Sequence, residues 1–499
     1  MKQKYLVVSD YFKSNKASMK YIYQMNYTFR FWIFLVTSLV LSLSSKAQLP
    51  TAQQTANAMT IGWNIGNSME AMYLYNGAMV AGENAWGNPN ISQTLIDSVK
   101  AAGFNTIRIP IAWDVHANPT THVIDAAWIA RVKQVVDYCI KRNMYVVINI
   151  HWDNGWLEKN VTQASQIAVN VKQKDYWTQI ANYFKAYDGH LLFASANEPD
   201  VSDATGMAVL LSYHQTFINA VRATGGNNSS RVLVIQGPST DIEKSNTLMN
   251  TMPTDQIANR IIVEVHYYTP YNFCLMTEDA TWGKQFYYWG KNNHSATDVA
   301  HNPTYGEEAD VDKLFGYMKT KFVDKGYPVI IGEFAAIKRT GLTGAALALH
   351  IKSRLYFYEY ISNAACKNNL KLIYWDAGNL GNNSMTLFDR TSGARIDRDA
   401  INALMKGTCL PVVTSISQIM EENSEIKYYP NPFNNNLQIE GNSQIIKVMI
   451  FDMLGNLAET KVAVGLDNHV QLGESLKPGS YFVQVHSAEK QKTFKVLKR

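Results

Sequence analysis

The sequence is poor in the features that mark several large classes of protein. Only 17% of its 499 residues are charged, and its four cysteines show no CxxC or other spacing typical of a metal site. It contains no HExxH motif, no phosphate-binding glycine loop and no nucleophile elbow. His116, His214, His294 and His350 are scattered along the sequence, without clustered acidic partners. We therefore expect no metal and no other cofactor.

The positive charge of the chain lies near its two ends. The formal net charge is +5, but residues 1–47 carry +6 and residues 425–499 carry +2, which leaves about −3 for the region between them. A protein that follows a phosphate backbone needs basic residues along its folded surface. We therefore expect no nucleic-acid partner.

One apolar run bears on the destination of the protein. The run Phe31–Leu43 is too short to span a membrane comfortably, follows an arginine and ends before the small-residue cleavage pattern SKA. We interpret residues 1–47 as a secretory signal peptide, with Gln48 as the first mature residue. The segment before Met25 is unusually long for such a leader, so Met25 is a candidate for the true start. An uncleaved membrane anchor is the alternative.

Apolar, β-rich runs alternate with helical patterns between residues 48 and 410. There are eight such runs: TIGWNIG (60–66), NTIRIPI (105–111), MYVVINI (144–150), LLFASAN (191–197), RVLVIQG (231–237), IIVEVHY (261–267), YPVIIGEF (327–334) and LKLIYWDA (370–377). Helical spacing is clear between them, for example in Ile129, Val132 and Val136. Eight buried strands, each followed by a helix, predict an α/β fold of the (β/α)8 TIM barrel type. The alternative, an open doubly wound sheet, would usually carry a glycine-rich phosphate turn after its first strand.

The composition changes beyond the expected barrel. Residues 411–424 form a polar linker, and residues 425–499 contain short alternating strands, glycine and asparagine turns and no helical pattern. These features predict a small all-β, immunoglobulin-like sandwich. Cys366 and Cys409 flank the last strand–helix unit of the barrel and could form a disulfide in an oxidising compartment. Buried free thiols are the alternative.

Polar and aromatic residues occur at the carboxyl ends of seven of the eight expected strands. Barrel enzymes build their active sites at these ends. The residues are Asn67, Glu70, Arg108, His151, Asn197, Glu198, His266, Tyr268, Glu333 and Trp375.

Two carboxylates stand out in this set, because Glu198 and Glu333 end strands on facing parts of the barrel wall. Hydrolysis of a glycosidic bond needs one carboxylic acid to protonate the leaving oxygen and one carboxylate to attack the sugar or activate water. Arg108 would keep the attacking carboxylate ionised, while burial and the neighbouring negative charge would raise the pKa of the acid. A lone buried glutamate is more often part of a salt bridge or a helix cap. Two of them at strand ends, beside asparagine and arginine, favour a catalytic pair.

Eight motifs of the barrel, in order, resemble glycoside hydrolase family 5, and are most similar to its subfamily 4 of endoglucanases and xyloglucanases. They are GWNIGNSMEA, GENAWGNP, AGFNTIRIPIAW, VINIHW, ANEP, VHYYTP, IGEF and YWDAGN, over roughly residues 57–406. The resemblance implies a retaining endo-β-1,4-glucanase that acts on β-glucans of the cellulose, mixed-linkage or xyloglucan type. A β-mannanase or another β-1,4-glycanase of the same fold is the alternative. A barrel that only binds polysaccharide would typically have lost one carboxylate or the arginine.

The resemblance also implies roles for the residues around the reacting bond. Glu198 would be the acid/base and Glu333 the nucleophile. Asn197 would bind the sugar 2-hydroxyl group, while Arg108 and Tyr268 would orient Glu333.

The same resemblance assigns the subsites. His151 and His266 would line the central subsite, and Trp375 would form its stacking floor. Asn67 and Glu70 would contact the sugar one subsite toward the non-reducing end.

One position departs from the family pattern. Trp152 stands where the family often has a second histidine, which puts the polar contact of that histidine in doubt and leaves stacking as its replacement. Trp156 and Trp282 lie on neighbouring loops, where they either extend the cleft or pack within the loops.

The C-terminal segments YPNPFNNNLQI, VMIFDMLGNL, LKPGSYFVQV and KVLKR resemble the type A sorting domain of the type IX secretion system of Bacteroidetes. The alternative is a carbohydrate-binding module, but residues 425–499 contain no tryptophan for such a module to expose. The resemblance implies passage through the periplasm to a secreted or cell-surface location. The expected partners are a β-linked polysaccharide and the type IX secretion machinery, and we expect a monomer.

Overall fold

The computed structural model describes residues 49–407, 426–441, 445–452, 457–462, 468–487 and 491–499. The chain divides into two compact units, residues 1–411 and 412–499. The predicted signal peptide and linker lie outside the described residues, so their boundaries remain predictions. No helix in the described ranges has both the length and the apolar character that a membrane span requires.

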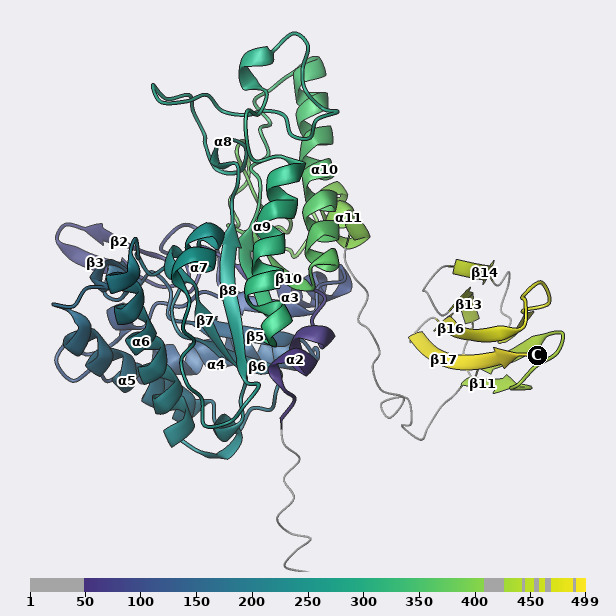
Figure 1. Cartoon of the computed structure of the whole chain (residues 1–499), viewed down its shortest axis with the longest axis horizontal. Coiled ribbons are helices and arrows are strands. Elements are labelled where there is room, and N and C mark those ends of the chain that lie inside the picture. The colour runs from purple at the N-terminus through teal and green to yellow at the C-terminus, as the bar shows by residue number, and fades with distance from the viewer. Residues whose placement is uncertain (1–48, 408–425, 442–444, 453–456, 463–467, 488–490) are drawn as a thin grey trace, which may run out of the picture. The chain divides into compact units, whose positions relative to one another are not determined.

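The first unit is a closed barrel of eight parallel strands (Figure 1). The strands pair around the wall in chain order, and the last one closes on the first. They are β1 (Ile61–Ile65), β4 (Thr106–Ile109), β5 (Tyr145–Asn149), β6 (Leu191–Ala194), β7 (Leu233–Gln236), β8 (Ile261–Tyr267), β9 (Val329–Phe334) and β10 (Leu370–Asp376). The predicted TIM barrel is confirmed.

A helix follows each barrel strand and covers the outside of the wall. These helices are α3 (Gln93–Ala101), α4 (Ala126–Ile140), α5 (Gln166–Tyr183), α6 (Ala204–Ala223), α7 (Ile242–Leu248), α9 (Glu308–Lys321), α10 (Gly344–Lys367) and α11 (Arg398–Gly407). In α4, Ile129, Val132 and Val136 are buried as their spacing predicts. The Asp125 carboxylate accepts the N–H groups of the first turn, which fixes where this helix begins. Shorter elements lie outside this pattern: α2 (Ala52–Ala58), β2 (Met72–Tyr75), β3 (Ala78–Ala81) and α8 (Tyr271–Cys274).

The barrel interior changes from apolar to polar toward the carboxyl ends of the strands. A buried apolar cluster includes Val147, Leu192, Val234, Ile262, Ile330 and Ile373, all from different barrel strands. Alternate residues of a strand face the same side. In β8 the side chains that follow Ile262 on the inner face are therefore Glu264 and His266. This polar layer supports the site at the mouth.

The second unit is a small sandwich of two antiparallel sheets. One sheet has the order β11–β12–β15 and the other β14–β13–β16–β17. Their strands are β11 (Ile426–Tyr429), β12 (Leu437–Gly441), β13 (Ile445–Phe451), β14 (Leu457–Val462), β15 (His469–Leu472), β16 (Gly479–Ser487) and β17 (Gln491–Lys498). Residues of both sheets, such as Ile439 and Val483, share one apolar core. The predicted all-β sandwich is confirmed.

The cysteines fall into two groups. Cys366 of α10 is disulfide-bonded. Its predicted partner, Cys409, lies outside the described residues, so this pairing remains a prediction. Cys139 and Cys274 are buried free thiols, and burial raises the pKa of both, which makes them unreactive.

Candidate active site

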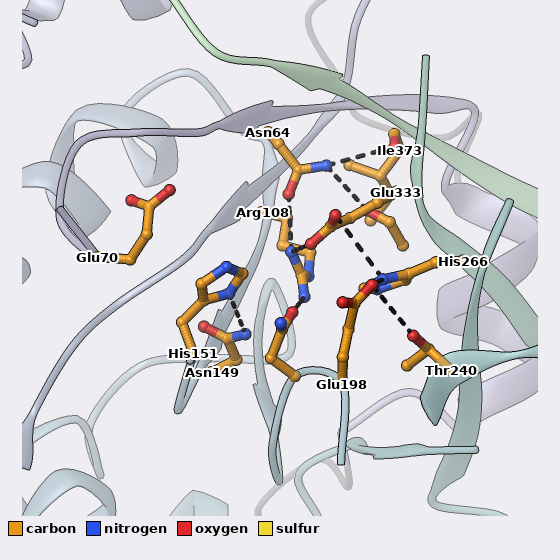
Figure 2. A network of polar contacts seen from close by, with 12 residues as sticks. Asn64, Glu70, Arg108, Asn149, His151, Glu198, Thr240, His266, Glu333 and Ile373 are labelled. Carbon is orange, nitrogen blue, oxygen red and sulfur yellow. Dashed lines mark hydrogen bonds and ion pairs between the residues drawn. The ribbon is translucent and has the colours of Figure 1, made fainter. Parts of the chain in front are cut away.

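Glu198 and Glu333 meet at the mouth of the barrel. Glu198 follows β6 and Glu333 belongs to β9, and Figure 2 shows both carboxylates and His266 pointing toward one another. One oxygen of each carboxylate and one ring nitrogen of His266 lie within 4.8 Å of one another. The Glu333 side chain is 8% exposed, whereas that of Glu198 is 44% exposed. The structure therefore brings a buried carboxylate and a more open one together at the mouth of the barrel.

Glu333 accepts hydrogen bonds from two of the residues that the sequence placed at the mouth. Its Oε1 accepts a hydrogen bond from Arg108 Nη1 at 2.9 Å, and its Oε2 accepts one from Tyr268 Oη at 3.1 Å. Arg108 Nη2 also donates to Asn197 Oδ1 at 2.8 Å. Asn64 Oδ1, which the sequence analysis did not single out, accepts from Arg108 Nη1 at 3.1 Å. Arg108 thus ties the Asn197 side chain to the Glu333 carboxylate.

Glu198 is held from two directions. Its Oε1 lies 2.7 Å from His266 Nδ1 and 3.5 Å from the hydroxyl of Thr240, as Figure 2 shows. Its backbone N–H donates to the carboxylate of Glu158 at 2.7 Å. Glu158 is buried in the loop after β5, and the sequence analysis missed it. Its position in an irregular turn gives no periodic signal.

A second carboxylate that the sequence analysis missed, Glu264, lies beneath this pair. It is fully buried, with Oε1 at 2.8 Å from Arg108 Nε and 3.3 Å from His266 Nε2. Its Oε2 accepts a hydrogen bond from Gln236 Nε2 at 2.5 Å. The sequence does contain a signal for Glu264: it is an acidic residue inside an apolar strand. Because it stands two positions before His266, the two side chains face the same side of that strand.

The pKa values in the ligand-free site reverse the expectation for the two catalytic carboxyl groups. Burial alone would lower the pKa of His266, but the charges of Glu333, Glu198 and Glu264 outweigh it and raise this pKa to about 10. Burial would raise the pKa of Glu198, yet the hydrogen bond and charge of protonated His266 bring it below its usual value. Burial raises the pKa of Glu333, against the attraction of His266 and Arg108. The prediction of a raised pKa for Glu198 in the free enzyme was wrong, because His266 supplies a cation.

The spacing of these donors also resembles that of a metal site. Among the described residues, Glu198, His266 and Glu333 form the one group with such spacing. A histidine ligand must be neutral, because the metal takes a nitrogen lone pair. His266 instead directs both ring nitrogens at carboxylates, Nδ1 at Glu198 and Nε2 at Glu264. This arrangement favours a bound proton.

Two of the residues predicted to line the central subsite, His151 and Trp375, have parallel rings. His151, which follows β5, stacks parallel to Trp375 of β10, with ring centroids 5.9 Å apart and an interplanar angle of 9°. Burial, together with the charges of Arg108 and His266, lowers the pKa of His151 well below its usual value, so its imidazole is neutral. Trp152 is 39% exposed, and its stacking on a sugar remains a prediction.

The two residues predicted to contact the next sugar differ in their surroundings. Glu70 is buried, and its carboxylate accepts the backbone N–H groups of Asn67 and Ser68. Figure 2 shows it apart from the catalytic pair. Asn67 is half-buried, with a left-handed backbone (φ 58°). The structure therefore gives Glu70 a role in closing this turn, and its contact with a sugar remains a prediction.

The remaining tryptophans of the neighbouring loops also differ. Trp156 is half-buried and donates its Nε1–H to Asp153 Oδ2 at 3.2 Å, which supports loop packing. Trp282 is 67% exposed and lies beside Tyr271, with ring centroids 6.1 Å apart.

Glu158 leads to a prediction about stability and pH. Burial raises its pKa to about 7, despite the opposing hydrogen bond from the Glu198 amide. A carboxyl group with a raised folded-state pKa stabilises the fold fully below its unfolded pKa, near 4.5, and this contribution is lost as the pH rises to about 7. The variant Glu158→Gln cannot ionise. Between pH 4.5 and 7.5, its free energy of unfolding should therefore gain about 3 kcal/mol relative to the unmodified protein.

Chemical denaturation of both proteins across this pH range measures the difference. Glu359→Gln is a matched control, because Glu359 of α10 pairs with Lys406 on the surface. A constant difference between Glu158→Gln and the unmodified protein over this range would contradict the raised pKa of Glu158.

Two family models match the chain, one for each structural unit. The model for "Cellulase (glycosyl hydrolase family 5)" matches residues 67–381, and the model for "Secretion system C-terminal sorting domain" matches residues 427–499. The first match contains every residue predicted for the site. The second match covers most of the sandwich and indicates a secreted or cell-surface protein.

Characterised relatives and solved structures agree with the first match. A xyloglucan-specific endo-β-1,4-glucanase of Bacteroides ovatus is 38% identical over 366 residues, which cover 72% of this chain and 70% of the relative. Endoglucanase A of Paenibacillus barcinonensis is 34% identical, over 75% of this chain and 96% of the relative. The structure of a xyloglucan-specific β-1,4-glucanase from a ruminal metagenomic library, in complex with XXLG, superimposes with a TM-score of 0.65 and 42% identity, over 72% of this chain and 96% of that one. The chain belongs to glycosyl hydrolase family 5.

Proposed function

We propose that this protein is a secreted, retaining endo-β-1,4-glucanase that hydrolyses β-glucans, including xyloglucan, by double displacement. The observation that carries the proposal is the facing pair Glu198 and Glu333. Carboxyl groups of retaining enzymes are roughly 5–5.5 Å apart, whereas those of inverting enzymes are about 6.5–9.5 Å apart. Carboxylate oxygens of Glu198 and Glu333 within 4.8 Å of each other support the retaining mechanism.

In the first step, Glu333 attacks the anomeric carbon. The bond from this carbon to the glycosidic oxygen breaks, and that oxygen takes a proton from Glu198. A covalent ester between the sugar and Glu333 remains. Arg108 and Tyr268 aim the attacking carboxylate by holding one oxygen each. Their two contacts restrict rotation of the carboxylate, so that little reorganisation is needed before the attack.

In the second step, water attacks the same carbon and Glu198 takes a proton from it. The ester bond to Glu333 then breaks, and the sugar leaves with its original anomeric configuration. The exposed side chain of Glu198 suits this step, because water must reach its carboxylate.

His266 supplies the proton that Glu198 needs at the start. In the ligand-free pair, the raised pKa of His266 and the lowered pKa of Glu198 favour the proton on His266, across a contact of 2.7 Å. Transfer of this proton from Nδ1 to Glu198 Oε1 produces a neutral imidazole and the acid form of Glu198. A substrate that displaces water from the site favours this neutral pair, since burial penalises separated charges.

Substrate choice can be tested with a panel of purified polysaccharides. We expect hydrolysis of mixed-linkage β-glucan, cellulose derivatives and xyloglucan, with a fall in viscosity that precedes the release of most reducing ends. Hydrolysis of xylan and mannan should be much slower. Faster hydrolysis of mannan would instead support a β-mannanase. Glu333→Gln, prepared in the same way, controls for contaminating glucanases.

The sandwich leads to a prediction about export. We propose that residues 425–499 direct passage from the periplasm through the type IX secretion machinery. Deletion of these residues should leave the barrel folded and active, because the two units have separate cores. In a host with this secretion system, the truncated protein should accumulate in the periplasm, as fractionation and activity assays would show. Normal export would contradict the sorting role, and loss of binding to insoluble polysaccharide would point to a binding module.

A further inference from the structure

Glu264 is a buried carboxylate that touches both cations of the active site but does not face the cleft. Its Oε1 lies 2.8 Å from Arg108 Nε and 3.3 Å from His266 Nε2. Burial of an ion costs several kcal/mol unless it is paired and hydrogen-bonded. Glu264 meets this condition through Arg108, His266 and the amide of Gln236.

The neighbouring strand, β9, has a glycine at the position that faces the Glu264 carboxylate. A Cβ atom added at Gly332 would lie 2.0 Å from Glu264 Oε1, so the neighbouring strand passes directly against the carboxylate. Gly332 immediately precedes Glu333. The residue before the attacking carboxylate thus has no side chain at the point where the buried carboxylate approaches.

The two cations that Glu264 contacts hold different catalytic groups. Arg108 donates to Glu333, whereas His266 lies 2.7 Å from Glu198. Glu264 lies against a different nitrogen of each cation from the one that meets a catalytic carboxylate, so its charge favours the orientation in which the other nitrogens face Glu333 and Glu198. A single buried side chain therefore supports both halves of the reaction.

The charge around His266 depends on Glu264. Four groups act directly on His266: the carboxylates of Glu264 (β8), Glu198 (after β6) and Glu333 (β9), and the imidazole of His151 (after β5). Three more groups contact these carboxylates: Arg108 of β4 contacts Glu264 and Glu333, the Tyr268 hydroxyl contacts Glu333, and the Thr240 hydroxyl contacts Glu198. Three of these groups are carboxylates, and Arg108 is the permanent cation among them. Removal of the Glu264 charge leaves two carboxylates to balance Arg108 and a protonated His266. The electrostatic stabilisation of protonated His266 is then weaker, so the histidine loses its proton more readily.

We propose that Glu264 is a positioning residue that keeps His266 doubly protonated and directed at Glu198, so that the His266–Glu198 pair retains the proton for the leaving group. The inference rests on the proposed function, in which Glu198 is the acid. Glu264 acts through His266 and touches no substrate.

The isosteric variant Glu264→Gln tests this role by the pH dependence of kcat/KM on a glucan oligosaccharide. The basic limb of this profile is the fall in kcat/KM at high pH, and it reports loss of the proton that the His266–Glu198 pair shares. We expect this limb to move at least about one pH unit toward acid, since one unit is the effect of a modest change in charge interaction. A shift of one unit lowers kcat/KM about tenfold at a pH above the basic limbs of both proteins, and the loss should be smaller on an aryl glycoside whose phenol needs no protonation.

Two further variants separate charge from packing. Glu264→Asp keeps the charge, so it should lower kcat while its basic limb stays close to that of the unmodified protein. Asp397→Asn is the matched control. It breaks a buried contact of 2.6 Å with Arg354, at a position whose contacts do not include Glu198, His266 or Glu333. It should lower stability without moving the basic limb.

A direct measurement does not depend on activity or on the substrate. Histidine labelled with ¹⁵N reports the protonation of each ring nitrogen, and the His266 signals are assigned by their loss in His266→Asn. In the unmodified protein, both His266 nitrogens should carry protons at pH 8, and the pH at which His266 loses its second ring proton should be at least about one unit lower in Glu264→Gln. A neutral His266 in the unmodified protein would overturn the proposal, as would an unmoved basic limb in Glu264→Gln. If the unmodified protein hydrolyses no glucan, the proposed function fails while this measurement still decides the role of Glu264.

Discussion

Replacement of Glu333 with alanine should abolish glycosyl-enzyme formation on every substrate. Glu333 is the carboxylate that Arg108 and Tyr268 hold at the mouth of the barrel, and no other described carboxylate is held in this way. Without a nucleophile the first step cannot occur, however good the leaving group is. We expect kcat/KM to fall by about 10⁴-fold or more on both glucans and activated aryl glycosides.

The measurement compares both substrate types with unmodified protein and with Glu359→Gln, which removes a surface carboxylate on α10. The control should retain full activity. Thermal unfolding should show that Glu333→Ala is folded, because Arg108 keeps its contact with Glu264. Substantial activity of the folded variant on either substrate would place the nucleophile elsewhere.

Replacement of Glu198 with alanine should affect the two steps unequally. An aryl glycoside with an acidic phenol needs little protonation, so its first step should survive largely intact. Hydrolysis of a glucan needs the proton and should slow by roughly 10²–10⁴-fold. The second step lacks its general base on either substrate, so a covalent intermediate on Glu333 should accumulate. Mass spectrometry of the intact protein would detect it.

Azide distinguishes the two carboxylates by the product that it gives. It needs no deprotonation, so in Glu198→Ala it should attack the intermediate in place of water, restore turnover and give a β-glycosyl azide. In Glu333→Ala, azide could only replace the missing nucleophile, and its product would be an α-glycosyl azide. If the two variants gave the opposite products, the assigned roles would be reversed.

Much of the fold could be predicted because the barrel strands are apolar along most of their length. Each of the eight runs contains a barrel strand, although LLFASAN extends past β6, which ends at Ala194. The three residues that follow lead to Glu198 and keep an irregular backbone. Strand ends also identify residues of the rim, because in parallel strands of one barrel all the carboxyl ends meet at the same face.

The inner support of the site was harder to predict, for two physical reasons. Glu158 lies in a turn after β5, and its contact with the amide of Glu198 joins positions 40 residues apart in the chain. No local pattern encodes such a contact. The pKa values of Glu198 and Glu333 depend on how many charges surround His266, and those charges come from several strands. Their balance exists only after the barrel closes.

The close approach of Gly332 to Glu264 has a consequence for the evolution of this barrel. A first substitution of Gly332, even by alanine, would collide with the carboxylate while Glu264 is present. A first substitution of Glu264 by a shorter residue would leave the two cations without their buried partner. Each substitution alone destabilises the site, so a tolerated change at one position depends on the residue at the other. Among descendants of this sequence, they should be conserved as a pair or replaced as a pair.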